Sequence, residues 1–189
     1  RRAINSPGIL MGAALGAWHE KAPSARAGKL THVFLGPHAG SSSEIHRSLA
    51  RWPAFVSWTR EKNIASSAAR LLNDGSVIAW VQGRSEFGPR SLGNRSILAD
   101  PRPSGNKLRI NAMIKKREQY RPFAPSVLEE KIADYFEVAP GQKDFPFMIF
   151  VLNVRPEVRE LLGAVTHVDG TARVQSVARA ANPEYWELI

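Results

Sequence analysis

The sequence contains no cysteine and no hydrophobic run of membrane-spanning length. The first absence excludes disulfides and thiolate metal sites, and it is consistent with a reducing cytoplasm. The second gives no indication of membrane insertion. The chain also lacks an initiator methionine and a leader peptide, so we expect a piece of a longer cytoplasmic protein.

Several catalytic motifs are missing as well. The phosphate-loop pattern G-x-x-x-x-G-K-[ST] is absent, and so is the G-x-S-x-G pattern of serine hydrolases. The five histidines show no H-x-x-x-H spacing, so we expect no metal site in this chain. With no cysteine either, a covalent protein nucleophile has little support.

Acidic residues are scarce between Arg84 and Arg121. This window holds ten basic and three acidic residues, so it carries +7 of the chain's net charge of +9. Charge concentrated in this way indicates an anionic partner bound at one place rather than a generally basic surface.

Helical patterns recur along the chain. Residues 4–20 are apolar and rich in glycine and alanine, which predicts a helix packed closely against a neighbour. Ser41 and Glu44 predict a capping box, and residues 64–72 have helical spacing. Asn182, followed by a proline, predicts the start of another helix.

Strand patterns lie between these helices. Residues 77–81 predict a buried strand, and residues 147–154 predict a central strand. The combination indicates an α/β fold, more narrowly α+β. Residues 77–81 lead directly into GRSEFGPRSLGNRS, residues 83–96, and a glycine-rich loop after a buried strand is a common ligand site in α/β proteins.

This glycine–arginine loop, residues 83–96, is the strongest candidate for binding chemistry. Its glycines allow close approach to a ligand, and Arg84, Arg90 and Arg95 each present a planar donor fork. Phosphates and carboxylates match that fork. The alternative is a surface loop with solvated arginines.

A second basic segment is NAMIKKREQYRPFAP, residues 111–125. Lys115 and Arg117 form a K-x-R pattern, which would place both side chains on one face of an extended strand. Arg121 precedes Pro122, which favours extended geometry there. The alternative is an exposed helix end rich in lysine and arginine.

A third segment, THVDGTARVQ, covers residues 166–175. His167 and Asp169 could form an acid–base pair, and Arg173 could be a further anion ligand. A polar turn with an exposed histidine is also common in proteins without any function at that place.

The segments GRSEFGPRSLGNRSILADPR, INAMIKKREQYRPFAPSVLEE and AVTHVDGTARVQSV together resemble the C-terminal region of the NodU-type O-carbamoyltransferases, which act on nodulation factors, tobramycin and cephamycins. The resemblance implies a YrdC-like twisted mixed sheet with flanking helices over residues 31–189. Residues 1–30 would be the end of an ASKHA-like domain and a linker. We expect truncation at both ends, because the family continues past Ile189 into an N-T-S-F-N segment.

The resemblance also implies a reaction. Carbamoyl phosphate and ATP, with Mg²⁺, would form carbamoyl-adenylate, whose carbamoyl group passes to a hydroxyl of a small-molecule acceptor such as a sugar, nodulation factor or antibiotic. The metal of the N-terminal domain would not be contained in this chain, which alone would be inactive or partly active. The catalytic residues would be Arg90, Lys115 and His167. The substrate- and ATP-binding residues would be Arg84, Arg95, Arg117, Arg121, Asp169 and Arg173.

Two other readings are open. A basic YrdC-like RNA-binding module without catalysis would explain the charge, although Phe87 and Tyr120 are few aromatics for base stacking. The second reading is a purely structural fragment, whose arginines pair with acidic groups of the missing domain. We expect neither a nucleic acid nor a membrane as partner.

Overall fold

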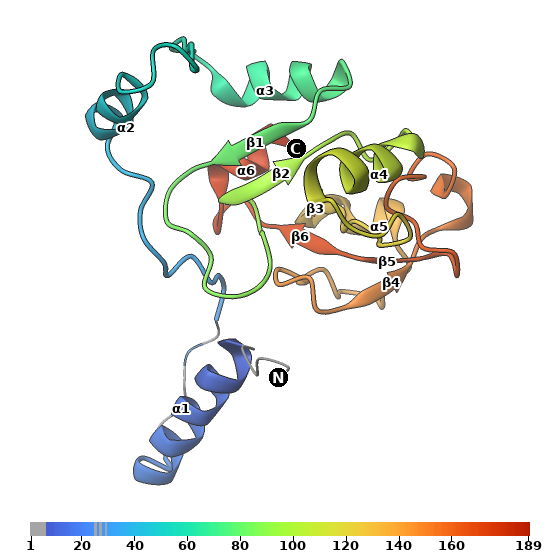
Figure 1. The fold of residues 1–189 in the computed structure, drawn as a ribbon. Coiled ribbons are helices and arrows are strands. Elements are labelled where there is room, and N and C mark those ends of the chain that lie inside the picture. Colours follow the sequence, from blue (N-terminus) through green and yellow to red (C-terminus); the bar gives the residue numbers. More distant parts are fainter. Residues whose placement is uncertain (1–6, 25, 27, 29) are drawn as a thin grey trace.

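The computed structural model describes residues 7–24, 26, 28 and 30–189, and its fold is mixed α/β (Figure 1). The helices are α1 (Pro7–Lys21), α2 (Ser42–Leu49), α3 (Ile64–Asn73), α4 (Gly105–Ile110), η1 (Asn111–Lys115), η2 (Glu129–Lys131), α5 (Ile132–Tyr135), η3 (Pro156–Val158) and α6 (Pro183–Leu188). The strands are β1 (Ile78–Val81), β2 (Arg95–Leu98), β3 (Ser126–Leu128), β4 (Val151–Asn153), β5 (Thr171–Arg173) and β6 (Gln175–Val177). The predicted α/β class is therefore confirmed.

The strands pair in three separate two-stranded sheets within the described residues. β1 pairs with β2 and β4 with β5, both antiparallel, while β3 and β6 run parallel. The pairing is mixed, as expected, but one continuous twisted sheet is not formed in this part of the chain. The YrdC-like topology stays a prediction.

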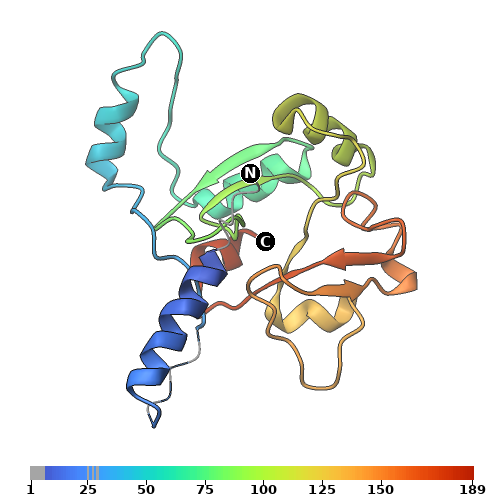
Figure 2. The same ribbon diagram turned by 60° about the horizontal axis from the view of Figure 1, so that its bottom comes forward.

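Helix α1 projects away from the rest of the molecule in both views (Figures 1 and 2). The predicted helix is confirmed over its described part, and residues 4–6 lie outside the described residues. A methyl group added at Gly12 or Gly16 would meet nothing within 4 Å, so the expected close-packed neighbour is not found among the described residues. No helix in the described ranges is both long and apolar enough to cross a membrane.

Two predicted helix starts are confirmed, because both depend on local hydrogen bonds. At α2, the Glu44 backbone N–H donates to Ser41 Oγ (3.3 Å), and the Ser41 N–H donates to Glu44 Oε2 (2.7 Å). At α6, the Tyr185 N–H donates to Asn182 Oδ1 (3.3 Å). Side-chain caps of this kind satisfy the backbone donors that a helix leaves unpaired.

Two hydrophobic clusters form the interior. The first core surrounds β4 and β5 and contains Val127, Ile132, Phe136, Phe145, Val154, Leu162, Val165, Ala172 and Val174. The second core joins α3, β1 and α6 and contains Ala65, Ala68, Trp80, Val177, Tyr185 and Leu188. β6 follows β5 after one residue, so residues 171–177 connect the two cores.

The predicted strands are shorter and less buried than expected. In β1 only Trp80 is buried, and Val81 is 60% exposed. The strand predicted over residues 147–154 forms only over β4, and it is not central, because β4 pairs with β5 alone in a two-stranded sheet. Met148 has a left-handed backbone (φ 52°), which interrupts the extended chain, and Val151 of the short β4 is 55% exposed.

Candidate functional site

The glycine–arginine loop connects β1 to β2 and is closed by one carboxylate. Glu86 Oε1 accepts hydrogen bonds from the backbone N–H groups of Leu92 (2.7 Å), Asn94 (3.0 Å) and Arg95 (3.2 Å). Charge-assisted bonds of this kind are stronger than neutral ones. The sequence presented Glu86 only as an opposing charge, and this structural role was missed.

Gly93 anchors the same loop to helix α6. Its backbone is left-handed (φ +108°), and a Cβ atom there would lie 2.3 Å from Cδ1 of Tyr185. Gln175 Nε2 also donates to the Leu92 carbonyl (2.8 Å), which fastens the loop to β6. The loop is therefore a fixed scaffold, and Arg90 lies on the exposed part of it.

Two of the predicted arginines hold backbone carbonyls. Segment 33–39 pairs with the first half of the loop, and Arg84 Nη2 donates to the Leu35 carbonyl there (2.7 Å). Arg95 Nη1 donates to the Gln82 carbonyl (2.6 Å). Both guanidinium groups thus contribute to holding the loop in place, and their predicted role in binding stays a prediction.

The K-x-R segment does not lie on a strand, so that part of the prediction is wrong. Lys115 is the last residue of the π-helix η1, and Lys116 has a left-handed backbone (φ 45°). Helix α4 continues into η1 and ends in this turn, which matches the alternative of an exposed helix end. Arg121 forms an exposed ion pair with Glu118 (2.7 Å).

Asn111 holds Arg117 in place beneath this turn. Its side chain is fully buried, and Oδ1 accepts from Arg117 Nε (2.7 Å). Nδ2 donates to the Arg121 carbonyl (2.9 Å), while the Arg117 guanidinium lies 4.8 Å from the centre of the Phe123 ring. Nothing in the sequence pattern distinguished Asn111 from a surface residue.

Arg173, on β5, is within the electrostatic influence of two other guanidinium groups. Burial lowers its pKa, and the charges of Arg90 and Arg117 lower it further. Its Nε is buried and has no hydrogen-bond partner among the described residues. Like charges gathered around an unsatisfied donor are best accommodated by a bound anion.

His167 completes this group from the turn before β5. Burial lowers its pKa, Asp169 acts in the opposite direction, and Arg173 and Lys107 lower it further. Its Nδ1 lies 3.0 Å from Thr171 Oγ1, which donates to Asp169 Oδ1 (2.7 Å). The predicted pair of His167 and Asp169 is thus joined through Thr171, and the hydrogen bonds from Thr171 lower the pKa of Asp169.

These side chains define an anion cluster, made up of Arg90, Lys107, Arg117, His167 and Arg173. They come from the loop, α4, the turn after η1, the turn before β5, and β5, and four of them carry a permanent positive charge. Such an arrangement can bind a phosphate or carboxylate. In the described part of the chain, no three His, Asp or Glu side chains gather to hold a metal ion, and the predicted absence of a metal stays a prediction.

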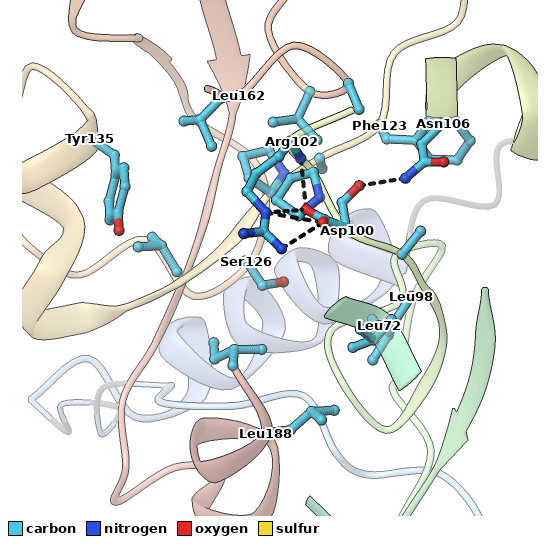
Figure 3. A pocket seen from close by; sticks show the side chains of 18 of the residues that line it. Leu72, Leu98, Asp100, Arg102, Asn106, Phe123, Ser126, Tyr135, Leu162 and Leu188 are labelled. Carbon is cyan, nitrogen blue, oxygen red and sulfur yellow. Dashed lines mark hydrogen bonds and ion pairs between the residues drawn. The ribbon is translucent and has the colours of Figure 1, made fainter. Parts of the chain in front are cut away.

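Two cavities are found in the described structure. One, of about 570 Å³, is mainly apolar and separates the two cores, and the Asp100–Arg102 ion pair (2.8 Å) lies beside it (Figure 3). The other, of about 670 Å³, lies between residues 31–34 and β6. None of the nine predicted site residues lines either cavity in the described chain, although Lys107 of the anion cluster lines the first one.

Comparisons with known proteins agree with the sequence resemblance. The family model described as "Carbamoyltransferase C-terminus" matches residues 69–189. Nodulation protein NolNO of Sinorhizobium fredii is 54% identical over 187 residues, covering 99% of this chain and 28% of that protein. Nodulation protein NolO of Bradyrhizobium diazoefficiens is 52% identical, with 99% of this chain and 34% of the relative covered.

A third relative carries a more specific name. The 3'-hydroxymethylcephem-O-carbamoyltransferase of Streptomyces clavuligerus is 46% identical over 126 residues, which cover 66% of this chain and 23% of that protein. The chain thus spans about a third or less of the length of these relatives. All three segments that carry the resemblance lie largely within the matched residues, and the chain belongs to the carbamoyltransferase C-terminus family.

Proposed function

We propose that this chain is the part of an O-carbamoyltransferase that binds the phosphate groups of carbamoyl phosphate and ATP. The observation that carries the proposal is the pair of buried, unpartnered nitrogens, His167 Nε2 and Arg173 Nε. Nearby cations of the cluster lower the pKa values of His167 and Arg173. A phosphate dianion would satisfy both nitrogens and offset the repulsion.

The reaction proposed is the formation of carbamoyl-adenylate, followed by transfer of its carbamoyl group to a hydroxyl of a small-molecule acceptor. Water releases phosphate from carbamoyl phosphate to leave carbamate, carbamate attacks the α-phosphorus of ATP and displaces pyrophosphate, and transfer of the carbamoyl group to the acceptor hydroxyl releases AMP. Fixed guanidinium groups would offset the charge of the two phosphate-bearing reactants and align them, and neither task needs a protein nucleophile. The name of the cephem relative supports an oxygen as the acceptor atom.

Mg²⁺ would enter with ATP, bound through the phosphate oxygens. Mg²⁺ is usually held by one or two carboxylates together with substrate phosphates. Among the described residues no group of three His, Asp or Glu side chains could hold the ion by itself, so the phosphate oxygens of ATP would supply most of its ligands. We further propose that residues 31–189 form a YrdC-like domain, and that the acceptor binds outside this chain.

The test uses the full-length protein and measures pyrophosphate release in the presence of both carbamoyl phosphate and ATP. We expect Arg90→Ala and Lys115→Ala to abolish it without changing the circular dichroism spectrum. Arg109→Ala is the matched control, because Arg109 lies in the same basic window but donates to the Gly75 carbonyl (2.9 Å). Wild-type rates in either of the first two variants would contradict the assignment.

A thermal-shift series separates this proposal from RNA binding. Stabilisation of the chain by ATP or carbamoyl phosphate supports the enzyme. Stabilisation by short RNA alone, with a steep dependence on salt, supports the nucleic-acid module instead.

A further inference from the structure

The hydrogen bonds around His167 fix which ring nitrogen carries its proton. Asp169 Oδ1 is a carboxylate oxygen that can only accept, so the Thr171 hydroxyl proton is used in that 2.7 Å bond. The Thr171 oxygen must then accept from His167 Nδ1, which lies 3.0 Å away. Neutral His167 therefore carries its proton on Nδ1.

This tautomer leaves Nε2 with a lone pair. Nε2 is buried and has no hydrogen-bond partner among the described residues. An unprotonated nitrogen repels an anion, whereas a protonated one donates to it with the strength of a charged hydrogen bond. The neutral ring is therefore favoured when no anion is bound to the cluster, and the protonated ring is favoured when an anion is bound.

We propose that anion binding at the cluster takes up one proton at His167 Nε2, and that Thr171 is the positioning residue that reserves this nitrogen for it. The inference rests on the proposed anion site. It deepens that proposal by making the affinity of the site depend on pH.

The charged groups that face His167 support this coupling. Arg173 and Lys107 oppose its protonation, Asp169 favours it, and burial keeps its pKa below the ordinary value in the empty site. A dianion placed beside His167 and Arg173 would offset these cations and raise the pKa. Binding then takes up a proton at any pH between the two pKa values.

The sign of the pH dependence follows. Above the pKa of the bound state, the ring is neutral with or without the anion, and affinity is low and constant. As pH falls from the pKa of the bound state to that of the empty site, affinity for the anion rises by up to about tenfold per pH unit. This is the largest change that the uptake of one proton allows. Below the pKa of the empty site, the ring is already charged, and affinity is high and constant.

Sulfate is the probe of choice, because it is a dianion that does not itself titrate near neutral pH. Calorimetric titration of the whole chain in two buffers of different ionisation enthalpy, at fixed ionic strength, gives the number of protons taken up per sulfate. For the wild type we expect proton uptake to reach a maximum approaching one proton per sulfate. The maximum should lie between about pH 5 and pH 8, the range in which histidine side chains titrate.

Thr171→Val removes the hydroxyl and keeps the shape of the side chain. The neutral ring is then free to place its proton on Nε2, and it can donate to sulfate without taking up another proton. We expect sulfate still to bind, with proton uptake reduced to less than about half of the wild-type value. Thr166→Val is the matched control, because the Thr166 hydroxyl donates to the Leu162 carbonyl (2.9 Å) and not to His167.

His167→Gln is the second variant, since glutamine donates from an amide without titrating. In this variant, proton uptake per bound sulfate should fall to near zero while sulfate binding persists. The inference is overturned if the wild type binds sulfate without proton uptake, or if Thr171→Val behaves like Thr166→Val, and in both cases the anion site itself stands. Failure of the wild type to bind sulfate at all overturns the site and the inference together.

Discussion

Replacing Gly93 with alanine tests whether the glycine–arginine loop depends on its contact with Tyr185. The added Cβ would lie 2.3 Å from Cδ1, 2.6 Å from Cγ and 2.7 Å from Cε1 of the tyrosine ring. Tyr185 is only 2% exposed and is packed in the second core, so the ring has little room to move. The backbone at Gly93 is also left-handed (φ +108°), which alanine disfavours.

Both costs can be estimated separately. A left-handed backbone costs a residue with a Cβ about 1–2 kcal/mol. Forcing an extra carbon atom into a packed core costs about 1–3 kcal/mol more. Together they predict a loss of about 2–5 kcal/mol in the free energy of unfolding, or a fall of roughly 10 °C in the midpoint of thermal unfolding for a chain of this size.

Thermal unfolding followed by circular dichroism measures the effect, and Gly75→Ala is the matched control. Gly75 also has a positive φ (+84°), but a Cβ there would meet nothing within 4 Å. It should therefore show the backbone cost alone, about 1–2 kcal/mol. Equal losses in the two variants would refute the contact between Gly93 and Tyr185 as the anchor of the loop.

Three further predictions address the supports of the site. Glu86→Gln replaces the carboxylate that accepts three backbone N–H bonds, and we expect a loss of about 2 kcal/mol in denaturant unfolding; an unchanged midpoint would contradict this. Asn111→Ala removes the support of Arg117, so it should lower the free energy of unfolding by about 3 kcal/mol and weaken sulfate binding. Asn106→Ala is the control, because the Asn106 side chain donates one hydrogen bond to a carbonyl. It should lower the free energy of unfolding by about 1 kcal/mol and leave sulfate binding unchanged. Burial raises the pKa of Tyr185 to about 12, so the unfolded chain ionises first and stability should fall as pH rises from the ordinary value of 10 toward 12. Tyr185→Phe should remove that part of the alkaline loss, and an identical pH profile in the variant would argue against it.

Local signals in the sequence predicted local structure well. The caps at Ser41 and Asn182 are confirmed, because such hydrogen bonds join residues only three positions apart. The strand predicted over residues 147–154 is confirmed only over Val151–Asn153, since an apolar run does not reveal a left-handed residue such as Met148. The K-x-R pattern left an extended strand and an exposed helix end open, and the helix is found, because α4 continues through η1 up to Lys115.

The supports of the site were beyond the reach of sequence patterns. Glu86 looks like a counter-charge among arginines until the folded loop brings three backbone N–H groups to it. The contact of Gly93 with Tyr185 spans almost half of the chain, and no periodicity encodes it. By contrast, Arg173 and His167 were singled out by residue type and spacing, and in the folded chain the charges of Arg90 and Arg117 act on Arg173, whose charge acts on His167.

The most direct test of the central claim is the affinity of the chain for ATP after Arg173→Gln, measured by calorimetry at fixed ionic strength beside Arg109→Gln. Both variants remove one positive charge, but only Arg173 has a buried nitrogen without a partner in the described structure. A lost hydrogen bond to a charged group predicts at least about tenfold weaker binding for Arg173→Gln, and less than about twofold for Arg109→Gln. Equal weakening in the two variants would show that ATP responds to the general basic charge and not to a site centred on Arg173.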